Sequence, residues 1–470
     1  MTNDNIRYDR QQRIKNWDQN RLTDAKVAII GSGPLSQFTA ASLAALGIGN
    51  IEIYDDGVNK GFLTSLSENY ENQSIENILQ QINSGIKVKQ TKIDDSLERS
   101  LDKKTDLILD LTNTPDLKDR VMNYASSEGI SVISASTDKT GGALYYVKPG
   151  EDVNGANLSE YAGETQGNFS SELFGGMITE ETRKHIMPLA DGEKPIKKLV
   201  YNATVERRFN AEKEFDAQPY EDISQKRILI VGAGALGNFV ALGAALEGFG
   251  YIDILDYDEV EDHNLNRQIL FYDAVGKAKS AALAEKIKKI NPNIHVEGLV
   301  GKLDENSTYF SQKKPDLIFD CVDKFSVRAI INYFAVHYSI PLVSGGTNAH
   351  SGQVVVYEPG QSACLDCKMG VEKALGISLQ GNKCTDEPDP SVIMTNEVIG
   401  GMMIGEALKV IDKGYGAPVS RILKYDANVS TRGGLVGASN PCDCSRSDIH
   451  EWLCDLKEKY ASIGEKGDGS

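Results

Sequence analysis

Residues 228–271 read ILIVGAGALGNFVALGAALEGFGYIDILDYDEVEDHNLNRQILF, and this stretch decides the fold. The apolar run Ile228–Val231 predicts a buried parallel strand, and the glycine-rich turn after it leads into apolar residues at helical spacing. A second predicted strand, Tyr251–Leu255, ends at Asp256. A strand, glycine turn, helix and strand in this order seat a nucleotide, because glycines let the backbone approach phosphate oxygens at a helix N-terminus.

The composition limits the class of protein. A chain of 470 residues is too long for one ordinary core, so we expect two or three domains. Fifty basic against 67 acidic residues give a formal charge of −17, which disfavours nucleic acid as a partner. No apolar run approaches the ~18 residues of a membrane span, and the polar N-terminus resembles no secretory signal. All seven cysteines lie beyond residue 320, which indicates metal or thiol chemistry in a reducing compartment and predicts a cytoplasmic protein.

The N-terminal half repeats the decisive stretch in a weaker form. Lys26–Ile30 leads into the turn Gly31–Ser36, and a second predicted strand, Asn50–Tyr54, ends at Asp55. Further landmarks recur in the same order: DLILDLT (106–112) with DLIFDCV (316–322), VISAST (132–137) with LVSGGT (342–347), GGALYYVKPG (141–150) with GQVVVYEPG (352–360), GGMITEETRK (175–184) with GGMMIGEALK (400–409), and KLVYNATV (198–205) with ILKYDANV (422–429). The recurrence predicts a duplicated chain of two α/β halves, each a largely parallel sheet with helices on both faces. The paired glycines before Met177 and Met402 predict close helix packing.

The two predicted halves differ where chemistry would occur. We expect an inactive half over residues 1–215 and an active half over 216–440, with a cysteine-bearing insertion at about 361–396. A last segment, 441–470, carries three cysteines, two of them in the pair Cys442 and Cys444, and a predicted helix over Ser447–Tyr460. In the first half Ser36 replaces the third glycine and Pro34 removes a backbone N–H, which weakens a phosphate cradle.

Charged residues after the second glycine turn favour a triphosphate over NAD. Asp256 lies 22 residues after Gly234, where a carboxylate can bind ribose hydroxyls; the alternative is a solvated carboxylate. Arg267 and Lys279 supply cations that a polyphosphate needs and that the ribose site of an NAD-dependent oxidoreductase does not. Asp323 follows a predicted strand and suits Mg²⁺ at the carboxyl edge of the sheet, or else caps a helix beginning near Ser326.

The cysteines suggest a metal site and a separate thiol. Cys364 and Cys367 form one pair and Cys442 and Cys444 a second, and four thiolates can bind Zn²⁺; reduced or disulfide-paired thiols are the alternative. Cys321 lies within an apolar strand and is expected in the core.

GAGALG, DYDEVEDHNLNRQ, GKAK and DCVD together resemble the ubiquitin-activating-enzyme superfamily, which includes bacterial adenylyltransferases that activate sulfur carriers for molybdopterin and thiamine synthesis. The resemblance covers about Ile228 to Asn428, and RYDRQ at Arg7–Gln11 is similar to the family's RYxRQ opening. It implies two Rossmann-like adenylation halves packed as an intramolecular pseudo-dimer that works as a monomer. Family members also carry two C-x-x-C pairs, whereas the second pair here is one residue tighter.

The resemblance implies a role for each matching residue. In the nucleotide site it implies that Gly232, Gly234 and Gly237 cradle the phosphates, that Asp256 binds the ribose, and that Asn264, Arg267 and Lys279 contact the phosphates. It implies that Asp323 binds Mg²⁺ and that the four paired cysteines bind Zn²⁺. It also implies that Arg10 reaches from the first half to the ATP and that Cys384 forms the thioester. Cys454, on the predicted C-terminal helix, is a weaker candidate for the cysteine that forms the thioester. Lys324 stands where the family usually has asparagine, and the lysine could substitute for the missing amide.

The implied reaction is ATP-dependent adenylation of a ubiquitin-like protein that ends in Gly-Gly, followed by thioester formation and hand-over to a conjugating enzyme. An alternative stops at the adenylate and feeds sulfur transfer or small-peptide modification. In that alternative, Cys384 is an exposed cysteine with no catalytic role. A non-catalytic scaffold would fit the first half alone.

Overall fold

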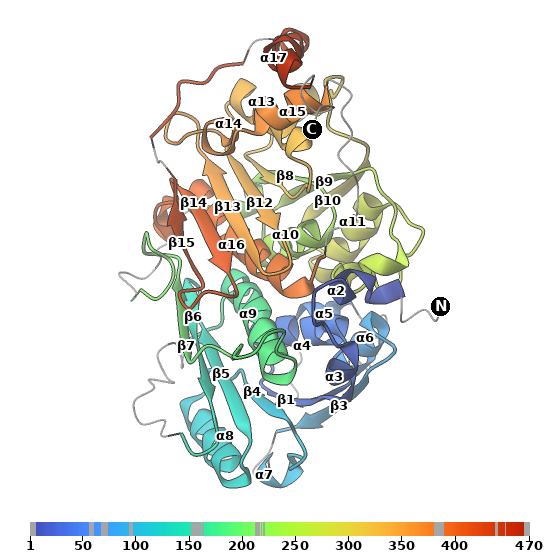
Figure 1. The fold of residues 1–470 in the computed structure, drawn as a ribbon, viewed down its shortest axis with the longest axis vertical. Helices are drawn as coiled ribbons and strands as arrows, with labels where there is room; N and C mark the ends of the chain where they lie inside the picture. The colour runs from blue at the N-terminus through green and yellow to red at the C-terminus, as the bar shows by residue number, and fades with distance from the viewer. Residues whose placement is uncertain are drawn as a thin grey trace.

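The computed structural model describes residues 6–55, 61–66, 74–93, 97–151, 161, 164–211, 217, 219, 221–379, 390–437, 440–446 and 448–464 of the 470-residue chain. Within this part the chain forms two mixed α/β sheets, one from each predicted half. Figure 1 shows the first half, blue to green, below the second half, yellow to red. The predicted pair of α/β halves is confirmed.

The first sheet has seven strands, of which the first five in spatial order run parallel and the last two antiparallel. Its strands are β3 (Lys87–Lys92), β2 (Asn50–Asp55), β1 (Lys26–Ile30), β4 (Leu107–Asp110), β5 (Ser131–Thr137), β6 (Gly141–Val147) and β7 (Lys198–Asn202). The near-continuous apolar run of β1 is explained by its place at the centre, where helices bury both faces.

The second sheet repeats this order and adds one antiparallel strand. Its strands are β10 (His295–Val300), β9 (Tyr251–Asp256), β8 (Arg227–Val231), β11 (Leu317–Asp320), β12 (Leu342–Thr347), β13 (Ser351–Tyr357), β14 (Ile422–Asp426) and β15 (Gly433–Val436). Strand order reverses at β8, which pairs with β9 on one side and β11 on the other. Ligands of open α/β sheets bind at the carboxyl ends of strands at such a point.

Helices cover both faces of each sheet. The first half contains α2 (Asp9–Gln12), α3 (Gln19–Asp24), α4 (Pro34–Leu46), α5 (Phe62–Ser65), α6 (Ile75–Ile82), α7 (Leu97–Ser100), α8 (Pro115–Glu128) and α9 (Asn168–Ile186). The second half contains α10 (Ala235–Glu247), α11 (Lys279–Ile290), α12 (Tyr309–Gln312), α13 (Phe325–His337), α14 (Leu365–Met369), α15 (Val371–Ser378), α16 (Ile393–Ile411) and α17 (Ile449–Gly464). None of the described helices has the length and apolar character needed to cross a membrane.

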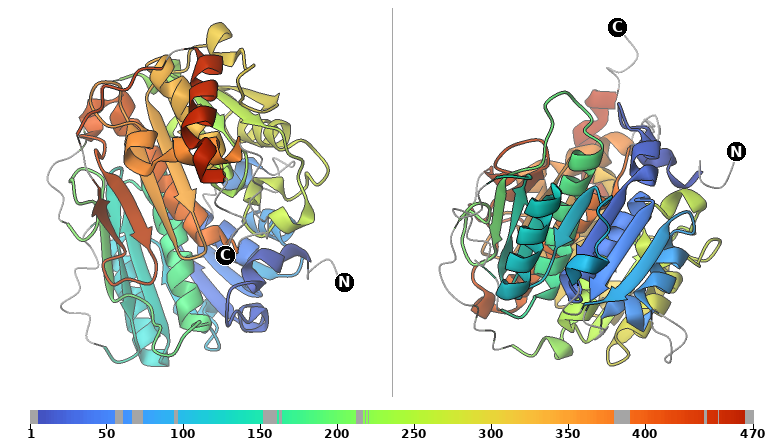
Figure 2. Two further views of the ribbon diagram at one scale, coloured as in Figure 1. Left: turned by 45° about the horizontal axis from the view of Figure 1, so that its top comes forward. Right: turned by 90° about the horizontal axis from the view of Figure 1, so that it is seen from below.

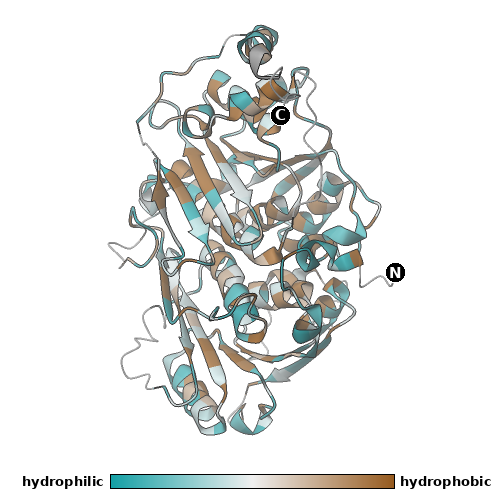
Figure 3. Ribbon diagram, in the orientation of Figure 1, coloured by the Kyte–Doolittle hydropathy of each residue, from teal (hydrophilic) through white to brown (hydrophobic). Residues whose placement is uncertain are grey.

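Helices α4, α9, α10 and α16 pack between the two sheets, so one continuous apolar core joins the halves. Separate apolar clusters lie on the outer face of each sheet, under α8 in the first half and under α13, α15 and α17 in the second. Figure 2 shows α17 lying across the outer side of the second half, where Trp452 and Leu456 are buried. Apolar residues follow the strands in Figure 3, and polar residues gather on peripheral helices and loops.

Paired glycines bring α9 and α16 into close contact, as predicted. A Cβ on Gly176 would lie 2.7 Å from the carbonyl oxygen of Met394, and a Cβ on Gly401 would lie 2.6 Å from the backbone nitrogen of Leu173. Real Cβ atoms do not approach backbone that closely, so only glycine permits this helix separation. The repeated GGM motifs therefore form one of the contacts between the halves.

Buried ion pairs lock the halves together reciprocally. Arg208 of the first half contacts Glu406 on α16 at 2.9 Å, and Arg432 of the second half contacts Glu181 on α9 at 3.0 Å. The lysines that follow each glutamate, Lys184 and Lys409, donate to backbone carbonyls of the opposite half. Burial alone would raise the pKa of Glu406, but the charges of Arg208 and Lys409 hold that pKa at about 2.

Two further glutamates face the interface, and neither forms an ion pair with a described cation. Glu172 and Glu397 each lie three residues before a glycine pair, and both are fully buried. The hydroxyl of Ser42 on α4 donates a hydrogen bond to Glu397 at 2.6 Å. The position equivalent to Ser42 in α10 is Gly243, which has no hydroxyl, and no described residue donates a hydrogen bond to either oxygen of Glu172. Burial and the neighbouring carboxyls of Glu397 and Glu247 raise the pKa of Glu172 well above its usual range.

Replacing Glu172 by glutamine is expected to remove a pH dependence of stability. The folded protein holds the Glu172 proton more tightly than the unfolded chain, so stability is greatest below the ordinary pKa of 4.5 and falls as pH rises toward the raised pKa. The stability gained by Glu172→Gln should grow by about 1.4 kcal/mol per pH unit across that window. Thermal unfolding at pH 5 and pH 8 measures it, with exposed Glu305→Gln as control. Parallel profiles for Glu172→Gln and wild type would contradict the expectation.

Candidate nucleotide site

The glycine turn of the second half opens onto the N-terminus of α10. Gly232 has φ +98°, a conformation that favours glycine, and a Cβ on Gly237 would overlap the carbonyl of Gly232. Gly234 is the N-cap of α10, and a Cβ there would meet no atom within 4 Å. No side chain among the described residues caps this helix. Its first N–H groups and the positive end of its dipole therefore face open space, which suits an anion.

The matching turn of the first half is filled by a glutamine. Gln166 accepts a hydrogen bond from the backbone N–H of Leu35 at 3.1 Å and donates to the carbonyl of Leu111 at 3.0 Å. A Cβ on Gly33 would overlap the same side chain. Pro34 also begins α4 and offers no N–H. The two turns thus share a backbone path but differ in the space available to a ligand.

Asp256 closes the second turn from the end of β9. Its carboxylate accepts from the N–H of Ala233 at 2.6 Å and from the N–H of Asp258 at 2.7 Å. Burial raises the pKa of Asp256, while these two hydrogen bonds and Lys279 oppose the rise. A freely solvated carboxylate, the alternative interpretation, is not what the structure contains.

Three predicted cationic residues converge around His263. Burial lowers the pKa of His263, the carboxylate of Glu261 at 3.4 Å opposes this, and the charges of Arg267, Arg10 and Lys279 lower it further. Arg267 is buried and donates to the carbonyl of His263 at 2.7 Å, whereas Lys279 contacts Asp258 at 3.1 Å. No described carboxylate forms an ion pair with Arg267.

Arg10 reaches this group from the first half. Its charge and burial together lower the pKa of Arg267 to about 10, burial being the larger cause. Arg7 helps to place α2 there, because its guanidinium donates across the boundary to the carbonyl of Leu265 at 2.9 Å. Arg267, buried beside another cation and in no ion pair with a described carboxylate, is therefore the group best suited to bind an anion.

Asn264 and Asp323 complete the predicted set. The side-chain oxygen of Asn264 accepts from the N–H of Glu261 at 2.9 Å and fixes a short 3₁₀ turn, Asp262–Asn264. Asp323 is exposed after β11, and Lys324, rather than Asp323, is the N-cap of α13. The alternative role of Asp323 as a helix cap is therefore wrong.

Asp323 faces the same sheet edge as Asp256. Burial raises the pKa of Tyr257, and the carboxylates of Asp258, Asp323 and Asp256 add to the rise, whereas Lys324 opposes it. All four charged groups therefore lie near one phenol. An exposed carboxylate at this edge is a suitable ligand for a Mg²⁺ ion that also binds phosphates.

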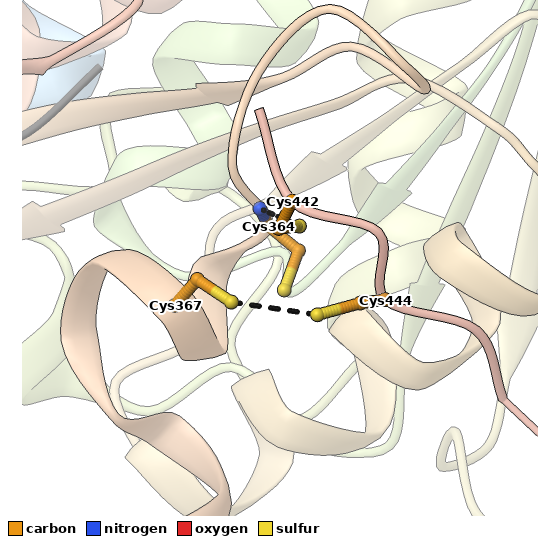
Figure 4. A group of neighbouring side chains, drawn as sticks. All are labelled: Cys364, Cys367, Cys442 and Cys444. Carbon is orange, nitrogen blue, oxygen red and sulfur yellow. Dashed lines mark hydrogen bonds between the residues drawn. The ribbon is translucent and has the colours of Figure 1, made fainter. Parts of the chain in front are cut away.

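The four paired cysteines come together at the outer end of the second half. Figure 4 shows Cys364 and Cys367 at the start of α14 facing Cys442 and Cys444 from the segment before α17. All four sulfurs lie within 4.8 Å of one another, and none forms a disulfide. Zn–S bonds of ~2.3 Å place tetrahedral sulfurs ~3.8 Å apart, so the donor set fits Zn²⁺. The backbone N–H of Cys364 donates to the sulfur of Cys442 at 3.2 Å, which favours a thiolate.

The remaining cysteines differ in surroundings. Cys321 is buried in the core beside β11, as expected, and burial raises its pKa. Cys454 is exposed on α17. Cys384, predicted to form the thioester, lies outside the described residues.

Sequence reasoning missed three residues of the site. Gln166 fills the first turn, Asn266 contacts both Gln11 and Arg267, and His263 lies among the cations. Gln166 lies outside every repeated motif and carried no signal. Gln11 and Asn266 do lie within the RYDRQ and NLNRQ motifs, so they could have been suspected.

Comparison with known proteins extends over both halves. Residues 8–168 and 206–445 match the profile of the ThiF family. The molybdopterin-synthase adenylyltransferase of Escherichia coli K12 is 34% identical over 219 residues, covering 45% of this chain and 84% of that protein. The SUMO-activating enzyme subunit 2 of Dictyostelium discoideum is 29% identical over 214 residues, covering 45% of this chain and 31% of that protein.

A third relative is the adenylyltransferase and sulfurtransferase UBA4 of Yarrowia lipolytica, 38% identical over 154 residues, which cover 33% of this chain and 39% of that protein. The chain thus spans less than half the length of two of these three relatives. The family profile, in contrast, matches most of the chain in two consecutive segments that correspond to the two halves. The resemblance found in the sequence is confirmed, and this chain belongs to the ThiF family.

Proposed function

We propose that the second half adenylates the C-terminal carboxylate of a ubiquitin-like protein, with ATP as the co-substrate. The observation that carries this proposal is the open N-terminus of α10 in the same half as Arg267 and Lys279, which lie with the cross-half Arg10 around His263. The filled turn at Gln166 supports an inactive first half. Relatives named as adenylyltransferases and as an activating enzyme support the same reaction class.

The chemistry follows from the charges. An oxygen of the terminal glycine carboxylate attacks the α-phosphorus of ATP, the bond from that phosphorus to the bridging oxygen breaks, and pyrophosphate leaves with the electron pair. Arg267, Lys279 and Arg10 would stabilise the negative charge on the phosphates, and Asp256 would hold the ribose. Mg²⁺ bound through Asp323 would supply further neutralisation. The products are an acyl-adenylate and pyrophosphate.

A second step would transfer the carrier to a thiol. The thiolate of Cys384 attacks the carbonyl carbon of the adenylate, a thioester forms, and AMP leaves. The sequence after Cys384, TDEPDP, is acidic and disfavours a thiolate. We therefore expect the Cys384 thiol to become reactive only when it approaches the adenylate. A conjugating enzyme would then accept the carrier. The four-cysteine site would be structural, with Zn²⁺ holding the segment before α17 against α14.

Replacing Cys384 by alanine is expected to abolish the thioester and leave adenylation intact, because the first step needs no protein nucleophile. Candidate carriers that end in Gly-Gly are incubated with ATP·Mg²⁺, and pyrophosphate exchange and a thiol-sensitive adduct are followed together. Wild type should show both, and Cys384→Ala only the exchange. Cys454→Ala is the matched control and should retain both.

The outcomes separate the candidate functions. An adduct that survives in Cys384→Ala removes that residue from its role. Exchange without an adduct in the wild type favours the second candidate, an adenylate passed to sulfur transfer, which the sulfurtransferase relative also suggests. Absence of exchange with every Gly-Gly carrier, although ATP binds, would overturn the proposed substrate class.

A further inference from the structure

The segment that supplies the predicted phosphate ligands also holds the two halves together at the site. Asn264, Arg267 and the intervening Asn266 belong to the same short motif, yet the side chain of Asn266 points to a different partner, Gln11 of α2. Both Asn266 and Gln11 are fully buried. A fully buried amide pair between residues 255 positions apart needs an explanation beyond packing.

We propose that Asn266 is a positioning residue that couples helix α2, and with it Arg10, to Arg267. The inference rests on the proposed function and deepens it, because it assigns to the inactive half a defined way of acting on the working site. The residue itself touches neither nucleotide nor carrier in this proposal.

A chain of hydrogen bonds carries the coupling. Arg267 donates to the side-chain oxygen of Asn266 at 2.7 Å, and the Asn266 amide donates to the side-chain oxygen of Gln11 at 3.0 Å. The Gln11 amide in turn donates to Gln19 at 2.7 Å and to the carbonyl of Leu46 at 3.0 Å. The chain therefore runs from the guanidinium in the second half to the end of α4 in the first.

The direction of the chain is fixed by its first member. A guanidinium can only donate, so the oxygen of Asn266 must face Arg267 and its NH₂ must face Gln11. Gln11 must then turn its own oxygen to Asn266 and its NH₂ to α4. Every amide orientation in the chain thus follows from the charge of Arg267, and each member is satisfied at both ends.

A neutral amide suits this place better than a carboxylate would. Besides burial, the charge of Arg10 lowers the pKa of Arg267 and that of the neighbouring His263. Asn266 orients Arg267 without neutralising it, whereas an aspartate there would form a buried ion pair and remove the demand for an anion.

Five variants of the full chain test the proposal: Asn266→Ala, Gln11→Ala, Arg10→Ala, Asn266→Asp and the double variant of Arg10→Ala with Asn266→Ala. In Asn266→Ala and Gln11→Ala the KM for ATP in pyrophosphate exchange should rise roughly tenfold, the effect of losing one charge-linked buried hydrogen bond. Adding Arg10→Ala to Asn266→Ala should cost much less than Arg10→Ala costs alone, because the chain of hydrogen bonds that positions Arg10 is already broken. Asn266→Asp keeps an acceptor for Arg267 but sets its second oxygen against the side-chain oxygen of Gln11, so the KM for ATP should rise in this variant as well. The much smaller cost of Arg10→Ala in the Asn266→Ala background is the result that a purely structural role would not produce.

Asn168→Ala is the matched control. It removes another hydrogen bond between the halves, from the Asn168 amide to the carbonyl of Leu246 at 3.0 Å, at a place remote from the site. Its KM for ATP should match the wild type. A similar rise in Asn168→Ala, an unchanged KM in Asn266→Asp, or fully additive effects of Arg10→Ala and Asn266→Ala would overturn the proposal.

The same variants separate this inference from the proposed function. Binding of ATP·Mg²⁺ is measured by calorimetry alongside exchange, and the same order of effects is expected in the dissociation constant. If no carrier supports exchange, the function fails while the binding data still decide the role of Asn266. If the wild type binds no ATP, both fail.

Discussion

Arg267→Ala is expected to lower kcat/KM for pyrophosphate exchange by about 10²–10³-fold, the usual cost of removing a preorganised group that stabilises developing charge. Arg267 is buried, is oriented by the carbonyl of His263 and by Asn266, and forms no ion pair with a described carboxylate. Its charge is therefore held ready for the phosphates and needs no reorganisation when ATP binds. Steady-state exchange with a Gly-Gly carrier measures the effect.

Lys277 provides the control for that substitution. It is also basic and lies two positions before Lys279, but it is exposed and contacts Glu285 at 3.3 Å. Lys277→Ala should change exchange by less than about threefold, since an exposed ion pair contributes little. Equal losses in Arg267→Ala and Lys277→Ala would show a general charge effect in place of a specific contact.

Glu406→Leu is expected to destabilise the folded chain by about 3–5 kcal/mol, because it leaves two buried cations without their carboxylate. Glu406 contacts Arg208 from the other half at 2.9 Å and Lys409 at 2.5 Å, and it accepts from the N–H of Val419 at 2.8 Å. All of these groups lie at the interface between the halves. Urea or thermal unfolding followed by circular dichroism gives the shift.

Glu128→Leu is the matched control for the ion pair. Glu128 pairs with the exposed Lys103 at 3.0 Å, and its loss should change stability by no more than about 0.5 kcal/mol. Activity lost in Glu406→Leu at temperatures where the chain remains folded would indicate that Glu406 does more than hold the two halves together. A shift as small as that of Glu128→Leu would refute the buried lock.

The sequence was enough for the arrangement of the fold. β1 begins and ends at the predicted residues, Lys26–Ile30, and the repeated GGM motifs do mark the contact between the halves. These features rest on local apolar patterns and on close backbone contacts that only glycine permits, and both leave a signal in the sequence.

The contacts between distant side chains could not be predicted. Gln166 fills the first glycine turn only because the chain after β6 returns to that place, and no local pattern reports this path. Asn266 and Gln11 meet across 255 positions. Lys324, and not Asp323, is the N-cap because α13 begins at Phe325, two residues after Asp323, and local pattern does not resolve a helix boundary to one or two residues.

The number of ATP molecules bound per chain tests most directly whether only the second half works. Titration calorimetry with ATP·Mg²⁺ should give one site for each wild-type chain, and Arg267→Ala should weaken that site strongly. Two sites per chain, or one site whose affinity is unchanged in Arg267→Ala, would contradict a single nucleotide site at the N-terminus of α10.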